Sequence, residues 1–588
     1  MDEMKVRIAE SFLVSVSILR IMRLALSIIA LCFSAMPLLA ANCAVVRNHP
    51  PSEADQALLA ADYAKAVSLY QAHLAAYPHD TEQKIGLVHA LLRQQKVQEA
   101  ADAAKAALAD APNSASLITL RGEVEYRQGM PWIAAQTAFE SDKLDPCNPR
   151  NHLLLADLER ISSLYASSRK QLERAHQLDP VDPEIRGEWL HTLPLKQRIA
   201  ELEAYLSVPT GNDEEDTRRW REYLERLKKM EVEPHEACRL VSTTANTDIP
   251  FDWMYDANHL KGFGLDVKLN GRKSELQIDT GAGGILVSRS VAKRAGLKPF
   301  VETKISGVGD EGDQPGYSAY AESIHIGNLE FQDCQVHVLG SRNAVDNVDG
   351  LIGMDVFSHF LVTLDYPDHK LLLNSLPPRP GESAAQGTSL KTSGAEGVED
   401  EEPAAVSEAA AQDKPVVKEA TTVAAAPVAA SGNSSSKQRT AKGPYDRYIA
   451  PEMKDYIKVY RIGHDLILPA GLNSKEIKLF IMDTGAFATT ISPQAAREVT
   501  KVHSNDHSVV RGIDGRVEKV YSADDISFHF ANLIQKARNV VSFDTSRISK
   551  NVGMEISGLL GESTLNLLTI HIDYRDGLVK FDYDPKRR

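Results

Sequence analysis

Two copies of the tetrapeptide Asp-Thr-Gly-Ala are the residues of this chain whose types and spacing could do chemistry. They are Asp279–Ala282 and Asp483–Ala486, and each directly follows an apolar run. Two carboxylates that share one proton can activate a water molecule with one group and protonate a carbonyl oxygen with the other, because close like charges cannot both ionise cheaply. One tetrapeptide would supply half of such a pair, and this chain carries both halves.

The segments around the two tetrapeptides repeat the same landmarks in the same order. Each aspartate is preceded by two alternating strands, for which we expect hairpin turns at Asn270-Gly271 and near Ala470-Gly471. A serine follows each aspartate at nine residues (Ser288 and Ser492) and an alanine at thirteen (Ala292 and Ala496). A glycine-rich turn comes next, at Gly307–Gly312 and Gly512–Gly515. Each unit then has an apolar Gly-Leu-x-Gly (Gly350–Gly353 and Gly558–Gly561) and a closing pair of strands (Phe360–Leu373 and Leu567–Phe581). The sequence therefore contains an internal duplication of one β-rich unit.

These duplicated motifs resemble those of the retropepsin-like aspartic proteases, the single-lobe relatives of pepsin. The resemblance covers Phe251–Leu376 and Tyr445–Tyr583 and implies two all-β lobes. It also implies that Asp279 and Asp483 form a catalytic pair that holds the lytic water. A glycine-rich turn in both copies favours a retropepsin-like pseudo-dimer over the pepsin pattern, in which one lobe alone bears a flap.

The same resemblance assigns supporting roles to the neighbours of the two aspartates. Thr280 and Thr484 would bond across the interface, while Gly281 and Gly485 would permit a tight turn whose N–H groups face the carboxylates. The expected set is completed by the two following alanines and by the flap residues that would fold over a bound peptide: Ala282, Ala486, Gly307, Val308, Gly309, Gly512, Ile513 and Gly515.

Two positions depart from the family pattern. The residue after Asp-Thr-Gly-Ala is often polar in the family, whereas it is Gly283 in one copy and Phe487 in the other. After the bracing Gly-Leu-x-Gly, the first copy continues with Met354-Asp355, but the second continues with Glu562-Ser563 and lacks an Asp or Asn. The second copy therefore departs further from the family than the first.

A 34-residue period runs through the first third of the chain. Prolines and small residues recur at this spacing, at Pro78, Pro112, Pro146 and Pro180 and at Ala66, Ala100, Ala134 and Ser168. The double periodicity resembles the tetratricopeptide repeat, in which two antiparallel helices approach closely at the small residue. The alternative is an irregular helical domain with coincidental prolines. Either would present a surface for peptides or partner proteins, and neither contains residues suited to chemistry.

The chain is expected to be multidomain, an all-α tetratricopeptide-like array followed by two all-β retropepsin-like lobes. No aromatic residue occurs between Leu376 and Pro444, so that stretch cannot bury enough apolar area to fold. The expected segments are a signal peptide or anchor at 1–44, helical repeats at 52–187, a helical extension at 188–245, lobe 1 at 251–376, a disordered linker at 377–444 and lobe 2 at 445–588.

The amino terminus has the pattern of an export signal. Arg20 and Arg23 precede the apolar run Leu24–Ala41, which ends in small residues that suit a signal peptidase. The alternative is a retained membrane anchor, because a run of this length could just span a bilayer. In both cases we expect the rest of the chain to be periplasmic or extracellular.

Composition excludes several classes of function. The net charge is −14 and no basic stripe is present, so nucleic acid is not an expected partner. The five cysteines are scattered without CxxC spacing, which suggests neither a disulfide scaffold nor a cysteine zinc site. We expect no metal and no cofactor.

The sequence thus predicts an exported aspartic endopeptidase whose helical repeats recruit protein substrates or other protein partners. A flexible tether between the lobes keeps them at high effective concentration, which favours pairing within one chain over a homodimer. The alternative is a catalytically inert module that keeps the retropepsin-like fold for peptide binding or dimerisation on an extracytoplasmic scaffold.

Overall fold

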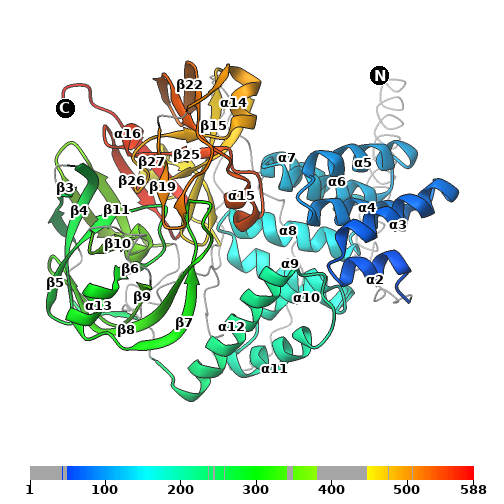
Figure 1. Cartoon of the computed structure of the whole chain (residues 1–588), viewed down its shortest axis with the longest axis horizontal. Helices are drawn as coiled ribbons and strands as arrows, with labels where there is room; N and C mark the ends of the chain where they lie inside the picture. The colour runs from blue at the N-terminus through cyan, green and yellow to red at the C-terminus, as the bar shows by residue number, and fades with distance from the viewer. Residues whose placement is uncertain are drawn as a thin grey trace, which may run out of the picture. The chain divides into compact units, whose positions relative to one another are not determined.

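The computed structural model confirms the predicted fold class, with a helical array followed by two β-rich lobes (Figure 1). It describes residues 43, 50–235, 238–242, 246–256, 259–340, 348–379, 446–474, 476–505 and 508–587. The expected signal or anchor at 1–44 lies outside these residues except for position 43, and the expected linker at 377–444 lies outside them from residue 380 onward. Among the described residues, no helix combines the length and the apolar character needed to cross a bilayer.

The array consists of helix pairs that repeat every 34 residues. The second helices begin at residues 63, 97, 131 and 165, and the first helices of the next pairs begin at 81, 115, 149 and 183. The array helices are α2 (Glu53–Leu59), α3 (Tyr63–Ala76), α4 (Thr81–Arg93), α5 (Val97–Asp110), α6 (Ala115–Arg127), α7 (Pro131–Leu144), α8 (Pro149–Ile161), α9 (Tyr165–Leu178) and α10 (Pro183–Leu190). The structure therefore contains the helical repeat that the sequence predicts.

Local chemistry explains where these helices begin and how closely they pack. The residues Asp80, Ser114, Asn148 and Asp182, spaced by 34, cap the first helices, because each side chain accepts a backbone N–H of the first turn. The small residues Ala66, Ala100, Ala134 and Ser168 are all buried. Each hairpin turn also holds one residue with positive φ, at Ala61, Gln95, Gly129 and Ser163.

A helical extension follows the array and returns to its first pair. It comprises α11 (Leu195–Leu206) and α12 (Glu214–Val232). In the loop between them, the Gly211 amide donates to the Leu59 carbonyl at 2.8 Å, and the Tyr63 hydroxyl donates to the Gly211 carbonyl at 2.8 Å. The start of α12 is therefore fixed against the beginning of the array.

The two lobes contain the same central arrangement. In lobe 1, β10 pairs in parallel with β5, which leads to Asp279, and antiparallel with β6. In lobe 2, β25 pairs in parallel with β16, which leads to Asp483, and antiparallel with β17. Lobe 1 contains β1 (Arg239–Leu240), β2 (Thr247–Pro250), β3 (Asp252–Asp256), β4 (His259–Leu269), β5 (Arg272–Ile278), β6 (Ile285–Ser288), α13 (Arg289–Ala295), β7 (Pro299–Ile305), β8 (Gln314–Ile326), β9 (Leu329–Leu339), β10 (Gly350–Ile352), η1 (Met354–Phe357), β11 (Phe360–Asp365) and β12 (Lys370–Ser375).

Lobe 2 is built from shorter strands than lobe 1. It contains η2 (Pro451–Met453), β13 (Ile457–Lys458), β14 (Tyr460–Ile462), β15 (Asp465–Leu472), β16 (Glu476–Met482), β17 (Thr490–Ile491), α14 (Pro493–Val499), β18 (Val502–Ser504), β19 (Arg511–Gly512), β20 (Gly515–Arg516), β21 (Tyr521–Ala523), β22 (Ile526–Phe530), β23 (Leu533–Ala537), β24 (Val540–Ser542), α15 (Ser546–Val552), β25 (Gly558–Leu560), α16 (Glu562–Leu565), β26 (Thr569–Asp573) and β27 (Leu578–Asp582).

One of the two expected hairpin turns is in a different place. The turn at Asn270-Gly271 joins β4 to β5 as expected, with positive φ at both residues. The expected turn near Ala470-Gly471 is wrong, because both residues lie inside β15 and the turn follows at Asn473-Ser474. Asn473 and Ser474 adopt φ of 50° and 57°, and asparagine is among the residues that tolerate this conformation best. Gly471 fits a turn pattern in the sequence, but in the structure it pairs with Ile477 of β16.

A sheet of closing strands joins the lobes. Its order is β13-β27-β26-β11-β12-β2, so β11 of lobe 1 lies beside β26 of lobe 2. The pairing is antiparallel, with Val362 opposite Ile572 and Leu364 opposite Ile570, and all four side chains are buried. Lobe 1 also contains a disulfide between Cys238 and Cys334, which are 96 residues apart and whose spacing gave no sign of pairing.

The helical array and lobe 2 share an apolar core. Buried residues of α6, α7 and α8 pack in one cluster with buried residues of lobe 2: Tyr126, Ala134, Ala138, Leu154, Leu155, Leu158 and Ile161 with Ile467, Leu479, Ile481, Val517, Val520, Phe543, Met554, Ile556 and Leu559. At the edge of this contact the Glu555 amide donates to the Arg127 carbonyl at 3.0 Å. The array is therefore part of the support of lobe 2, a contact that its repeat pattern did not reveal.

Candidate active site

The two tetrapeptides lie at equivalent places in the lobes and face each other. The Asp279 amide donates to the Ile352 carbonyl and the Asp483 amide to the Leu560 carbonyl, both at 3.0 Å. These carbonyls belong to β10 and β25, which run beside the strands that end at each aspartate. The Gly-Leu-x-Gly segments thus brace the two loops from the same side.

The two threonines connect the loops across the lobe interface. The Thr280 amide donates to the Thr484 hydroxyl and the Thr484 amide donates to the Thr280 hydroxyl, both at 3.0 Å. Each hydroxyl then donates to a carbonyl of the opposite strand, Thr280 to Met482 at 2.7 Å and Thr484 to Ile278 at 3.3 Å. Both threonines are buried, so this network fixes one loop against the other.

The two glycines leave room for the carboxyl groups. The Gly281 amide donates to Asp279 Oδ1 and the Gly485 amide to Asp483 Oδ1, both at 2.9 Å. A Cβ atom added to Gly281 would overlap the Asp483 carboxyl group, and one added to Gly485 would overlap that of Asp279. Ala486 donates a further N–H to Asp483 Oδ1 at 2.9 Å. Glycine is therefore required at both positions by space.

The Asp279 carboxyl group is buried and that of Asp483 is half-buried, and the two lie close enough that the charge of Asp483 raises the pKa of Asp279, which favours one proton on the pair. Burial raises the pKa of Asp279 well above its ordinary value, and the Asp483 charge raises it further. Burial also raises the pKa of Asp483, but the Ala486 N–H and the bond to Asp279 oppose that rise. Asp483 Oδ1 accepts two backbone N–H groups and Asp279 Oδ1 accepts one, which favours Asp483 as the ionised member when the pair holds a single proton.

A cavity of about 1110 Å³ opens above the pair. Both aspartates line it, together with Gly281, Ala282, Gly485 and Ala486 and with the flap residues Gly307, Val308, Gly512 and Ile513. Apolar side chains of lobe 2 form much of one wall, at Ile462, Ile481, Val541, Phe543, Ile548, Val552 and Leu559. Such a cavity can hold an extended peptide over the two carboxyl groups.

The two glycine-rich turns meet over this cavity. The Asp514 amide donates to the Val308 carbonyl at 3.0 Å, and the Glu311 amide donates to the Asp514 carbonyl at 2.8 Å. Gly309 and Gly515, the remaining predicted flap residues, have positive φ. The structure thus brings together all of the site residues that the sequence predicts, although Gly309 and Gly515 are not among the residues that line the cavity.

One departure from the family pattern has a spatial explanation. A Cβ added at Gly283 would overlap the imidazole of His464, which comes from lobe 2. His464 Nε2 lies 3.2 Å from the Gly281 carbonyl, and its ring lines the cavity. Sequence reasoning missed His464, because no local signal links it to a glycine 181 residues earlier. Phe487, the counterpart of Gly283, is 62% exposed and lines the cavity.

The second departure concerns the acidic residue after each bracing strand. The Asp355 carboxylate accepts the Gly284 amide with both oxygens, at 2.9 and 3.1 Å. In lobe 2, Glu562 uses its own amide to reach the Ala486 carbonyl at 2.7 Å, and its buried side chain has a pKa raised by burial to about 7. The loop of lobe 2 is therefore braced through the backbone.

This raised pKa predicts a pH-dependent effect of Glu562→Gln. Because the folded state holds its proton up to about pH 7, ionisation costs stability progressively as pH rises from about 4.5 to 7. The glutamine variant lacks this cost. Its melting temperature should match that of the wild type at pH 4 and exceed it by about 2–4 °C at pH 8. Equal melting temperatures at both pH values would contradict a buried ionising Glu562.

Within the described part of the chain, no group of three or more His, Cys, Asp or Glu side chains is placed to hold a metal ion.

Comparison with known proteins gives a family match and, among the solved structures, likenesses that include a TPR protein. Residues 265–359, which include Asp279 and the first flap, match the model of the family described as "gag-polyprotein putative aspartyl protease". A solved thermophilic TPR protein from Thermus thermophilus is similar at 20% identity and a TM-score of 0.25, over 29% of this chain and 95% of that chain. No protein with a curated description matches.

Proposed function

We propose that this chain is an aspartic endopeptidase that hydrolyses peptide bonds with Asp279 and Asp483. The observation that carries the proposal is the pair of facing carboxyl groups, one buried and one half-buried, at the floor of a peptide-sized cavity. The family match over residues 265–359 supports it for the first lobe.

We propose different roles for the two carboxyl groups. Ionised Asp483 takes a proton from a water molecule as the water oxygen attacks the peptide carbonyl carbon, while Asp279 gives its proton to the carbonyl oxygen. The tetrahedral adduct then breaks its C–N bond, and the proton held by Asp483 goes to the leaving amine. The product acid returns a proton to Asp279. Thr280, Thr484, Gly281 and Gly485 hold the two groups in place, and the flaps exclude bulk water.

These protonation states predict the pH profile. Activity needs Asp279 protonated and Asp483 ionised, so the profile should be bell-shaped. Both pKa values are raised above 3.8, so both limbs should lie above that pH, with the upper limb set by Asp279. The test is cleavage of a peptide mixture by the full chain across pH 3–8, with new termini identified by mass spectrometry. An inert peptide-binding module would retain peptides and produce no new termini at any pH.

We further propose that the lobes pair within one chain. Supporting this are the threonine bonds, the pairing of β11 with β26, and the Asp446 carboxylate, which accepts the Ala166 and Ser167 amides of α9 at 2.9 and 2.8 Å. His464 of lobe 2 also fits against Gly283 of lobe 1. The counterpart of Gly283 in lobe 2 is Phe487, which has a much larger side chain. The copies are therefore complementary.

Intrachain pairing predicts a specific activity that does not change with protein concentration. Mixing the Asp279→Asn chain with the Asp483→Asn chain should restore no activity, because each chain contains one damaged pair. Light scattering should give the mass of one chain. Recovery of activity in the mixture would show that the pair forms between molecules.

We propose export across a membrane from the Leu24–Ala41 run, and the Cys238–Cys334 disulfide agrees with an oxidising compartment. Cell fractionation would contradict this if the chain stayed in the cytoplasm.

We also propose that the helical repeats recruit protein substrates or partners. Point changes on exposed array residues that slow cleavage of a protein substrate, and leave short peptides unaffected, would support recruitment; equal effects on both would contradict it.

A further inference from the structure

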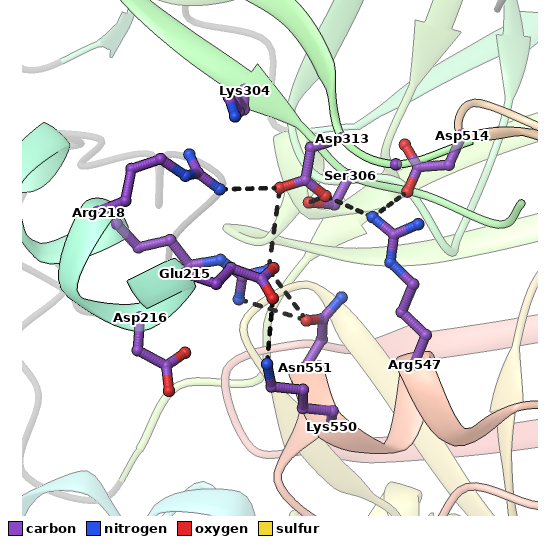
Figure 2. A network of polar contacts seen from close by, with 12 residues as sticks. Glu215, Asp216, Arg218, Lys304, Ser306, Asp313, Asp514, Arg547, Lys550 and Asn551 are labelled. Atoms are coloured by element: carbon purple, nitrogen blue, oxygen red, sulfur yellow. Dashed lines mark hydrogen bonds and ion pairs between the residues drawn. The ribbon is translucent and has the colours of Figure 1, made fainter. Parts of the chain in front are cut away.

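The carboxylate of Asp313 lies where three parts of the chain meet (Figure 2). Asp313 directly follows the first flap turn, and its side chain is 7% exposed. Its Oδ1 accepts the Ser306 hydroxyl at 2.8 Å and the Arg547 guanidinium at 2.6 Å. Its Oδ2 faces Arg218 at 3.4 Å and Arg219 at 4.0 Å. One buried charge therefore joins the first flap to α15 of lobe 2 and to α12.

Arg547 connects the same charge to the second flap. Its guanidinium lies 2.9 Å from Asp514 Oδ2 and donates to the Gly309 carbonyl at 3.1 Å. Asp514 is fully buried and accepts the Gly307 amide at 3.0 Å. Both flap tips are therefore held by one arginine, which Figure 2 shows between the two aspartates.

The position of α12 beside the flap is itself fixed. Lys550 of α15 bonds Asp213 at 3.2 Å and Glu215 at 3.1 Å at the start of α12. Arg219 donates to the Asn551 side chain at 3.2 and 3.3 Å. The loop before α12 is bonded to the first helix pair of the array through Gly211. The arginines that meet Asp313 therefore project from an anchored helix.

The chemistry of this cluster favours a persistent ion pair. Although burial raises the pKa of Asp313, the Ser306 hydroxyl and the Arg219 and Arg547 charges outweigh it and hold the pKa below its ordinary value. Asp313 thus stays ionised across the pH range in which the catalytic pair would work. Arg218 and Arg219 also line the cavity, so the ion pairs lie at the wall that a substrate passes.

We propose that Asp313 is a positioning residue for the peptidase, and that α12 sets how readily the first flap opens. The ion pairs to Arg218, Arg219 and Arg547 hold Gly307 and Val308 over Asp279 and Asp483. This inference rests on the proposed peptidase function for its kinetic consequence. The closure itself does not depend on catalysis.

The kinetic test compares Asp313→Asn, the double variant Arg218→Gln/Arg219→Gln, and the control Arg221→Gln. Arg221 is exposed on the same helix and lies outside the cavity lining. Loss of the ion pairs favours the open flap and weakens peptide binding, so KM should rise about tenfold in Asp313→Asn while kcat changes less than about threefold. The double variant should shift KM in the same direction, and Arg221→Gln should not shift it.

A second measurement is independent of activity. The amides of Asp310, Glu311 and Asp514 donate across the closed flaps, so their hydrogen exchange reports flap opening. Exchange at these amides in the full chain should become about tenfold faster in Asp313→Asn and in the double variant, and should not change in Arg221→Gln. If Asp313→Asn fails to fold, the double variant carries the test.

Unchanged exchange in a folded double variant would overturn the role of α12. Faster exchange with an unchanged KM would overturn the positioning role of Asp313. Faster exchange in a chain whose wild type cleaves no peptide would leave flap closure standing and count against the peptidase function alone.

Discussion

Asparagine at position 279 or at position 483 is expected to lower kcat by about a thousandfold or more. An amide neither takes the proton of the attacking water nor shares the single proton that the pair needs. Asparagine keeps the size of the side chain and can still accept the Gly281 or Gly485 amide that each carboxylate accepts now. The measurement is kcat for a short peptide, together with the melting temperature of each variant.

The stability of these variants separates catalysis from folding. Both carboxyl groups have raised pKa values, so removing one ionisable group removes a cost at neutral pH. The melting temperature at pH 7 should therefore stay constant or rise while activity disappears. Asp266→Asn is the matched control, because Asp266 is exposed on β4 and forms a surface ion pair with Lys273. Activity within tenfold of the wild type in either active-site variant would exclude a mixed pair.

Removal of residues 54–183 is expected to abolish cleavage of short peptides as well as of proteins. The recruitment role that the sequence suggests would predict loss on proteins alone. The structure gives a different expectation, because α6, α7 and α8 cover buried side chains of lobe 2. Uncovering several such side chains costs about 1.5–3 kcal/mol each, a large share of the 5–15 kcal/mol that keeps a typical protein folded. The measurements are soluble yield, melting temperature and kcat/KM for a short peptide.

Gly129 offers a gentler test of the same contact. Equivalent turns of the other repeats hold Ala61, Gln95 and Ser163 at nearly the same positive φ, so this conformation does not require glycine. A Cβ at Gly129 would instead overlap the Glu555 carbonyl of lobe 2. Gly129→Gln should therefore lower the melting temperature and the short-peptide activity, whereas the matched Ala61→Gln should change neither. Equal behaviour of the two variants would show that the array and lobe 2 work independently.

The sequence could predict the parts of this molecule that depend on neighbours in the chain. The small residues recur every 34 positions because each helix pair needs one where its helices approach, so the sequence shows the array as a period. The two tetrapeptides were visible in the same way, because each loop needs its own glycine and its own bracing strand.

The remaining features depend on residues that are far apart in the sequence. His464 fits against Gly283, Cys238 bonds to Cys334, and Arg218 reaches Asp313, and none of these pairs has a local signature. The misplaced turn has another cause. Gly471 matches a turn pattern, but the residues around it pair with β16 as a strand. The turn follows at Asn473, which adopts positive φ. Spacing along the chain therefore indicates which residues could act, and three-dimensional contacts decide how they are held.

The pairing of β11 with β26 has a consequence for how the protein is made. Val362 meets Ile572 only after roughly 200 further residues have been synthesised, so lobe 1 emerges from the ribosome with one strand edge unpaired. Contacts of such long sequence separation form slowly, and an exposed apolar edge recruits other chains in the meantime. Chains that end before Thr569 should therefore aggregate rather than accumulate as a folded first lobe, and the complete chain should depend on chaperones until its last two strands arrive.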